Sequence, residues 1–210
     1  MRIRIFLKLT VALGIVSTLA GIVALADEAN KSGTIAGTVQ VKGAKSSADV
    51  VVYLEGVSGE FPLPNEHAVM NQRGKKYIPH VLPILKDTEV DIINSDELLH
   101  NVHAYWIEDK STMFNIAQPL KGQKYSRKLK KEGDVLLLCD QHAEMSAYIV
   151  VLPNPYFAKT DESGSFVIEK VLPGKYTLKV WHEKNKGESL EVIVEQGKTT
   201  TVNLILKKRK

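Results

Sequence analysis

The stretch CDQHAEM, residues 139–145, gathers three potential metal ligands within one short segment. Cys139 is the only cysteine of the chain, His142 follows three positions later, and Met145 follows three positions after that. A thiolate, an imidazole and a thioether are soft or borderline donors, which together suit a transition-metal ion such as copper. A buried structural cysteine beside a surface histidine is the simpler alternative. The choice depends on the elements that position these residues.

Two strand-like segments flank this stretch and predict where its donors point. Side chains alternate between the two faces of a strand, so GDVLLLCD places Cys139 on the same face as Leu137. In the same way, MSAYIVVL places Met145 on the face of Ala147. Residues 140–144 are therefore expected to form a tight loop, which brings the three donors to one end of a β-sandwich.

A fourth donor is expected from another strand, and His100 is the candidate. It lies in INSDELLHNVH, after the strand-like segment TEVDIIN and 39 residues before Cys139. Two imidazoles, one thiolate and one weak axial thioether form the ligand set of a blue-copper electron-transfer centre. Methionine is a poor ligand for zinc, calcium and magnesium. We therefore expect one copper ion bound by His100, Cys139, His142 and Met145.

The remaining histidines are weaker candidates. His103 is a rival ligand, but positions 100 and 103 of a strand face opposite sides, so it is expected beside the site or on the surface. His182 is expected on the surface by default, with a position facing a domain interface or a partner as the alternative. His67 and His80 are expected to be structural or solvated. The sequence contains no His-x-His pair, which argues against a multicopper oxidase or nitrite reductase. Without a nucleophile and base arrangement either, we expect that the protein is not an enzyme.

Most of the chain after Lys31 has the composition of β-strands separated by turns. The segments are rich in β-branched residues and bounded by Gly, Ser, Pro or Asp. No long amphipathic helix is indicated, so the expected fold class is all-β. The strand-like segments outside the CDQHAEM region include TIAGTVQV, ADVVVYLEG, TEVDIIN, SFVIEKV, KYTLKVW, LEVIVEQ and TTVNLIL.

The N-terminus has the pattern of a secretory signal peptide. Basic residues precede the apolar run TVALGIVSTLAGIVALA, which ends in the small-residue pattern Ala24-Leu25-Ala26. We expect residues 1–26 to be cleaved before Asp27, leaving no stable membrane insertion. A retained membrane anchor is the alternative, because the run is close to the length that spans a bilayer. In both cases the remaining chain would be periplasmic or otherwise secreted.

Charge and cysteine content narrow the class of protein further. The chain has 28 basic and 24 acidic residues, and loss of the signal segment would leave 25 against 24, a net charge of +1. A nucleic-acid partner is therefore not expected. A single cysteine cannot form an internal disulfide, and a lone thiol in an oxidising compartment must be buried or used.

The segment from about Tyr77 to Leu152 resembles the cupredoxins of the plastocyanin and amicyanin kind. The resemblance rests on NSDELLHNV and on the C-x2-H-x2-M loop. It implies a Greek-key β-sandwich in which His100, Cys139, His142 and Met145 bind copper and Asn101 braces the ligand loop. It also implies that the second histidine, His142, has an edge open to solvent and passes electrons to transient redox protein partners.

The C-terminal part resembles a different module. YFAKTDESGSFVIEKVLPGKYTLKVWHE and the following strands are similar to the carboxypeptidase regulatory-like domain, a small prealbumin-like β-sandwich. The first two strands of that module resemble SGTIAGTVQVKG and ADVVVYLEG, about a hundred residues upstream. We therefore expect one sandwich from residues 32–57 plus 154–208, interrupted by a cupredoxin domain at 58–153. The alternative assigns the N-terminal strands to the middle domain and leaves the C-terminal sandwich incomplete.

The combination of the two modules resembles bacterial plastocyanin-like proteins named for methylamine utilisation. The function expected from the residues and from the resemblance is one-electron transfer through a mononuclear copper site. Two alternatives remain open at this point. The same donors could serve a copper chaperone or scavenger, and a metal-free pair of β-sandwiches could serve as an interaction module.

Overall fold

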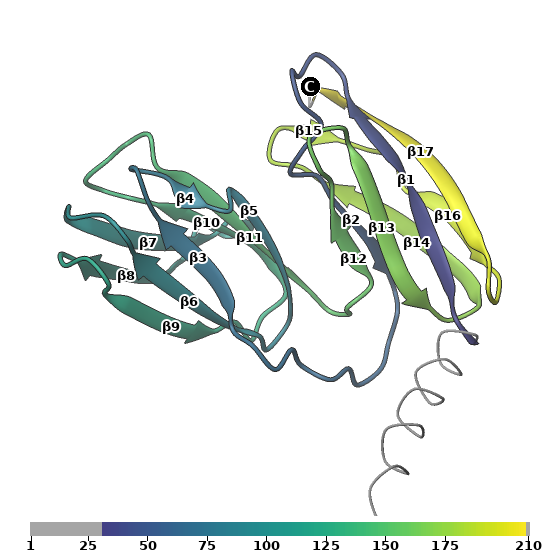
Figure 1. The fold of residues 1–210 in the computed structure, drawn as a ribbon, viewed down its shortest axis with the longest axis horizontal. Coiled ribbons are helices and arrows are strands. Elements are labelled where there is room, and N and C mark those ends of the chain that lie inside the picture. The colour runs from purple at the N-terminus through teal and green to yellow at the C-terminus, as the bar shows by residue number, and fades with distance from the viewer. Residues whose placement is uncertain (1–30, 209–210) are drawn as a thin grey trace, which may run out of the picture.

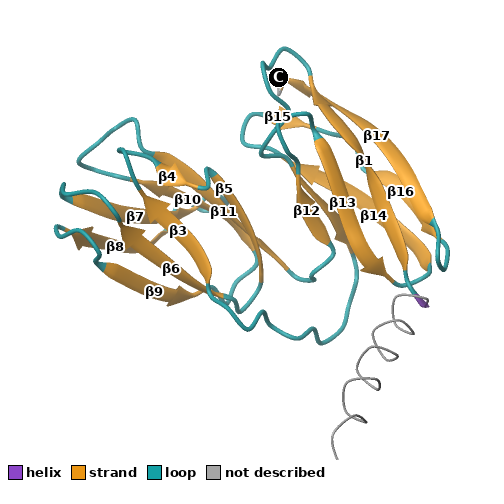
Figure 2. Cartoon of the chain, viewed as in Figure 1, coloured by secondary structure: helices purple, strands orange, loops and turns teal. Residues whose placement is uncertain are grey.

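The computed structural model describes residues 31–208, which fold into two β-sandwiches lying side by side (Figure 1). All the regular elements between residues 32 and 208 are strands, joined by turns and loops (Figure 2). This confirms the expected all-β fold class. Within the described residues, no helix has the length and apolar character needed to cross a membrane. The expected signal peptide, residues 1–26, lies outside the described residues.

The middle sandwich, formed by β3 to β11, consists of a five-stranded and a four-stranded sheet. The larger sheet has the strand order β5 (Val81–Leu85), β11 (Ser146–Leu152), β10 (Gly133–Leu138), β7 (His100–Trp106) and β8 (Thr112–Gln118). The smaller sheet has the order β4 (Tyr77–Ile78), β3 (Ala68–Gln72), β6 (Glu89–Asn94) and β9 (Lys124–Lys128).

The split sandwich is formed by strands from both ends of the chain. One sheet has the order β13 (Ser165–Val171), β1 (Gly33–Val41), β17 (Thr199–Lys208) and β15 (Asn185–Lys186). The other has the order β12 (Phe157–Lys159), β2 (Val51–Glu55), β14 (Gly174–Trp181) and β16 (Leu190–Val194). Strand β1 runs parallel to β17 and antiparallel to β13, so the N-terminal strand lies between two C-terminal ones.

The middle sandwich interrupts an antiparallel pair of the split sandwich. Strands β2 and β12 pair directly, although the whole middle sandwich lies between them in the sequence. Where the chain returns, the Asn154 side-chain amide donates to the Leu54 carbonyl at 2.9 Å. The Leu54 backbone N–H donates to the Tyr156 carbonyl at 3.0 Å. These bonds close the β2–β12 pair at the point where the middle sandwich leaves and rejoins it.

Strand β11 is covered on both of its faces. Ala147 and Ile149 point into the core of the middle sandwich. Val150 instead packs against the split sandwich, in a small interface cluster that also contains Val51 and Val81. Burial on both faces explains why SAYIVVL is an almost continuous apolar run rather than an alternating one.

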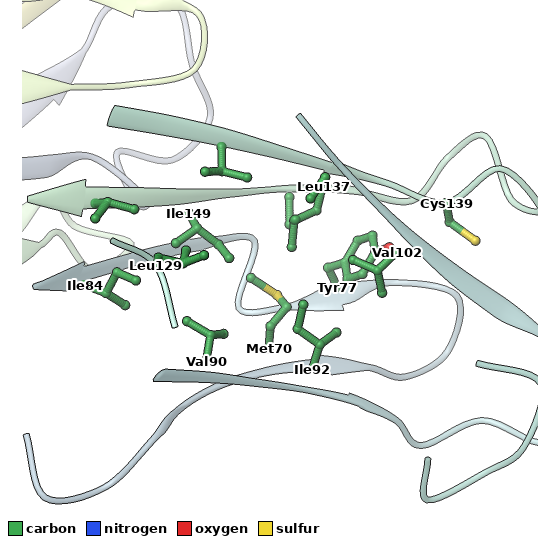
Figure 3. Close-up of a cluster of buried hydrophobic side chains, with 14 of the residues drawn as sticks. Met70, Tyr77, Ile84, Val90, Ile92, Val102, Leu129, Leu137, Cys139 and Ile149 are labelled. Carbon is green, nitrogen blue, oxygen red and sulfur yellow. The ribbon is translucent and has the colours of Figure 1, made fainter. Parts of the chain in front are cut away.

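The core of the middle sandwich ends at Cys139. Met70, Ile92, Leu137 and Ile149 are among its buried side chains. Figure 3 shows these side chains filling the space between the sheets, with Cys139 at one end of the row and its sulfur directed away from them. The core therefore fixes the strand that carries the thiol and leaves the thiol at the edge of the packed region.

Candidate metal centre

The segment from Cys139 to Met145 forms the tight loop that the strand pattern predicts. It joins the end of β10 to the start of β11. The backbone N–H of His142 donates to the Cys139 carbonyl at 3.3 Å, and that of Met145 donates to the His142 carbonyl at 2.9 Å. The Cys139 N–H donates to the Met145 carbonyl at 3.3 Å, which closes the loop at its base. Three of the four expected ligands are thus held by one connection.

His100, Cys139 and His142 direct their donor atoms at one another. The Nδ1 atoms of His100 and His142 are 3.1 Å apart. The Cys139 Sγ atom lies 3.9 Å from His100 Nδ1 and 3.7 Å from His142 Nδ1. Donors that share one metal ion at bond lengths of about 2.0–2.3 Å must lie roughly 3–4 Å apart. The three side chains form a cluster that could hold one metal ion.

Asp96 orients the imidazole of His100. His100 is the first residue of β7 and is completely buried. Its Nε2 atom lies 2.9 Å from a carboxylate oxygen of Asp96, so Nε2 carries the proton in this contact and Nδ1 is left with a lone pair. The carboxylate also accepts the backbone N–H groups of Gly74 and Lys75, at 2.8 and 3.0 Å. Burial alone would raise the pKa of Asp96, but the hydrogen bonds from Lys75, Gly74 and His100 together hold it at about 2.

The buried side chain of Asn94 shapes the loop that leads to His100. Its carbonyl oxygen accepts the backbone N–H of Asp96 at 2.9 Å. Its amide donates to the carbonyl oxygens of Leu98 and Gln118, both at 2.9 Å. One side chain therefore satisfies polar backbone groups across the loop, which is the physical reason for an asparagine at the start of NSDELLH.

Tyr77 connects the two strands that carry the buried ligands. Its hydroxyl lies 2.9 Å from the carbonyl oxygen of Asn101 on β7 and 3.1 Å from that of Leu138 on β10. Asn101 follows His100 and Leu138 precedes Cys139. Burial raises the pKa of the Tyr77 phenol, so it remains a hydrogen-bond donor. A single hydroxyl can thus limit the separation of His100 and Cys139.

Asn101 and Asp140 form a second brace across the same strands. The Asn101 side-chain oxygen accepts the backbone N–H of Asp140 at 2.6 Å, and its amide donates to the Asp140 carboxylate at 2.8 Å. Asn115 donates to the same carboxylate at 3.0 Å. Hydrogen bonds from Asn115 and His103 lower the pKa of Asp140. The arrangement fits the bracing role that the resemblance implies for Asn101.

Met145 is buried, with 1% of its surface exposed, and belongs to the same core cluster as Cys139. It therefore faces inward, as the alternation of MSAYIVVL predicts. The cluster of potential metal donors comprises His100, Cys139 and His142. Axial ligation by Met145 stays a prediction.

The other histidines have partners outside this cluster. The His103 imidazole contacts the Asp140 carboxylate at 3.2 Å and the Tyr105 hydroxyl at 2.6 Å, on the face of β7 opposite to His100. His67 contacts the carboxylate of Asp91 at 3.0 Å. His80 lies 3.5 Å from Glu183 of the split sandwich. His182 is partly buried in a cleft between the sandwiches, which corresponds to the domain-interface alternative rather than to the surface default.

Sequence reasoning missed two of the residues that position the site. Asp96 lies four residues before His100, and this spacing beside a candidate ligand was an available signal. Tyr77 carried no such signal, because its hydroxyl reaches the ligand strands only through the placement of the two-residue strand β4. Both residues act on the ligands through hydrogen bonds.

Comparison with known proteins gives matches for parts of the chain. Residues 154–202 match the family described as Polysaccharide lyase family 4, domain II. The assignment of this part of the chain to the carboxypeptidase regulatory-like domain therefore stays a prediction. No curated protein matches the chain.

The chain is also similar to solved cupredoxin structures. A purple cupredoxin from Nitrosopumilus maritimus is 21% identical, with a TM-score of 0.37, covering 40% of this chain and 99% of that chain. A reduced mutant of amicyanin is 21% identical, with a TM-score of 0.38, covering 48% of this chain and 98% of that chain. A Cu(I) mutant of amicyanin is 20% identical, with the same TM-score and the same coverage.

Proposed function

We propose that this protein is an exported blue copper protein that carries single electrons. His100, Cys139 and His142 would bind the copper ion, and Met145 would be a weaker axial ligand. The observation that carries the proposal is the convergence of two imidazole nitrogens and one sulfur within 3.1–3.9 Å of one another. This donor set is the one associated with blue-copper electron transfer.

The donor chemistry and its surroundings suit copper. A thiolate and a thioether favour copper over hard cations, and two imidazoles are compatible with both of its common oxidation states. Bound there, copper would supply a reversible one-electron change between Cu(II) and Cu(I). The protein would contribute rigidity, because Asp96, Tyr77 and Asn101 restrain the donors from outside the cluster. Restrained donors need little rearrangement when the charge at the site changes.

His142 offers a path for electrons to a partner. It is only partly buried, whereas His100 is completely buried. The loops at this end of the sandwich carry the exposed apolar residues Leu98, Leu99 and Leu120. His100, the first residue of β7, pairs with Gln118, the last residue of β8. This pairing places the loop before β7, which carries Leu98 and Leu99, beside the loop after β8, which carries Leu120. Exposed apolar residues in loops next to the strand of His100, together with a partly exposed His142, suit small, transient interfaces with redox proteins.

The burial of the donors argues against the main rival, a copper chaperone or scavenger. Such a protein would favour an exposed and exchangeable site, whereas Cys139 is only 3% exposed and His100 is 0% exposed. A metal-free interaction module would need no cluster of donors.

We propose further that the protein is not an enzyme and that it acts in the periplasm or outside the cell.

Metal analysis combined with voltammetry tests the proposal. Protein purified after expression with copper should contain one copper ion per chain and show a reversible one-electron wave. Binding without a reversible wave would favour the chaperone, and absence of bound metal would favour the interaction module. His67→Ala is a matched control, because His67 lies outside the donor cluster and should leave both results unchanged. Fractionation of cells that express the full chain would test export separately.

A further inference from the structure

A cleft of about 530 Å³ lies between the two sandwiches, apart from the metal donors. One wall is the outer face of the middle sandwich, where Tyr105, Leu136 and Leu138 point away from the core. The opposite wall includes Trp181 at the end of β14. The volume is within the range of about 300–1,000 Å³ that is typical of small-molecule sites, which often occur between domains.

Two tryptophans and two tyrosines line this cleft, together with three aliphatic and three charged side chains and His182. Trp106 and Trp181, the only two tryptophans of the sequence, both line it. Tyr148 also lines it, and its ring lies 5.3 Å from that of Trp181 at an interplanar angle of 62°. Aromatic rings from both sandwiches therefore line the cleft, and such rings can contact another aromatic ring face to face or edge to face.

His182 provides a hydrogen-bond donor at this site. Its Nδ1 atom accepts the backbone N–H groups of Lys184 and Asn185, both at 3.1 Å. The proton of the neutral ring is therefore on Nε2, and among residues 31–208 no hydrogen-bond partner of Nε2 is found. Burial lowers the pKa of His182, which favours the neutral ring. This N–H group is open to solvent, and a ligand atom that accepts a hydrogen bond could replace water there.

The carboxylate beside His182 already has partners. Glu183 lies 3.5 Å from His80 of the middle sandwich and 3.1 Å from Lys184. The cleft therefore does not present Glu183 as an unpaired anion to a ligand. Lys110 and Asp134 also line the cleft and carry opposite charges, so its lining offers no excess of one sign. This favours a neutral ligand over an ion.

The cleft is held open by contacts beside it. Val51 of the split sandwich is buried in one cluster with Val81, Val150 and Leu152 of the middle sandwich. The contact between His80 and Glu183 also joins the two sandwiches. Apolar packing on one side of the cleft thus fixes the distance between its two walls before a ligand binds. A site that is already ordered loses less conformational entropy on binding.

We propose that this cleft binds a small neutral aromatic molecule that carries an acceptor oxygen, such as a phenol. The ring would lie between Trp181 and Tyr105, and the oxygen would accept the hydrogen bond from His182 Nε2. The inference does not depend on a bound metal, because none of the cleft residues is a proposed ligand.

The cleft is nevertheless connected to the metal centre. Leu138 lines it and directly precedes Cys139 in the sequence. The hydroxyl of Tyr105 contacts His103, which in turn contacts Asp140 in the ligand loop. A bound aromatic molecule would therefore lie next to the strand that carries the thiol.

Calorimetric titration of the metal-free chain with 2-naphthol tests the proposal. We expect binding of one molecule per chain, much weaker binding of cyclohexanol, and shifts of both tryptophan indole N–H signals in NMR spectra. Leu136→Arg should lower the affinity at least about tenfold by filling the cleft, and His182→Leu should lower it several-fold by removing the donor. Leu172→Arg is the matched control, because Leu172 is exposed and lies outside the cleft. Circular dichroism would establish that each variant is folded.

Three results would overturn the proposal. The first is the absence of 2-naphthol binding to the unmodified chain. The second is binding that Leu136→Arg leaves unchanged, since the molecule would then bind elsewhere. The third is a concentration-dependent dimer in sedimentation experiments that Leu136→Arg converts to monomer, since a second copy of the chain would then be the occupant.

Discussion

The Nδ1 atoms of His100 and His142 lie 3.1 Å apart, although the two residues come from different connections of the middle sandwich. Asp96 fixes the proton of His100 on Nε2, so its Nδ1 atom presents a lone pair toward His142. A cation between the two nitrogens and the Cys139 sulfur would interact favourably with all three donors.

Asp96→Asn should weaken metal binding by about 10- to 100-fold, because the charged hydrogen bond that orients His100 is lost. Competition with a chelator would measure the affinity. Glu97→Gln is the matched control, since Glu97 is an exposed neighbour that pairs with Lys121. Equal affinity of the Asp96 variant and the unmodified chain would show that Asp96 does not position the ligand.

Tyr77→Phe should reduce the free energy of unfolding by about 0.5–1.5 kcal/mol, because the buried hydroxyl no longer donates to the Asn101 or Leu138 carbonyl. It should also broaden the NMR signals of His100, since the two ligand strands lose a shared contact. Chemical denaturation and NMR would measure the two effects. Tyr125→Phe, at a partly buried tyrosine of the same core, is the control. If both variants behaved alike, the brace would have no specific effect.

Met145→Leu should change the reduction potential of the copper site more than its copper affinity. A leucine can fill the buried space of Met145 but supplies no thioether to the axial position. Voltammetry and a chelator competition on the same samples would separate the two quantities. An unchanged potential would argue against axial ligation by Met145.

Asp91 should make the stability of the middle sandwich depend on pH at low pH. Hydrogen bonds from Ser126, His67 and Lys124 outweigh burial and lower its pKa to about 2, whereas the unfolded value is about 3.9. The stabilisation, on the order of 2 kcal/mol, is fully present above the unfolded pKa and is lost as the pH falls through about 2. Asp91→Asn should therefore flatten the stability profile between pH 5 and about pH 2.

Denaturation at a series of pH values would measure this profile. Ser126→Ala removes the largest of the contributions that lower the Asp91 pKa, so it should move the loss of stability to higher pH. A profile for Asp91→Asn that parallels that of the unmodified chain would contradict the assignment of the effect to Asp91.

Local sequence patterns were sufficient for much of the fold. The segments SAYIVVL and SFVIEKV coincide with β11 and β13, because β-branched residues and flanking turn residues define them. Strand β9, with the sequence KYSRK, carries no such pattern. It is a strand because it pairs along the edge of β6, and that pairing depends on the three-dimensional arrangement.

The same distinction applies to the functional residues. Cys139, His142 and Met145 could be predicted because one short loop contains them all, and His100 because it follows a recognisable strand. Tyr77 could not be predicted, since its role depends on where its hydroxyl ends in space. The cleft at Trp181 was also unpredictable, because it exists only where the outer faces of two sandwiches meet.

The visible absorption spectrum of the chain starting at Asp27, recorded before and after addition of Cu(II), tests the central claim most directly. We predict an intense thiolate-to-copper band that a mild reductant bleaches and an oxidant restores. Cys139→Ser should lose the band while its circular dichroism shows an intact β fold. A pale complex without this band, or an unchanged band in Cys139→Ser, would contradict the proposed copper site.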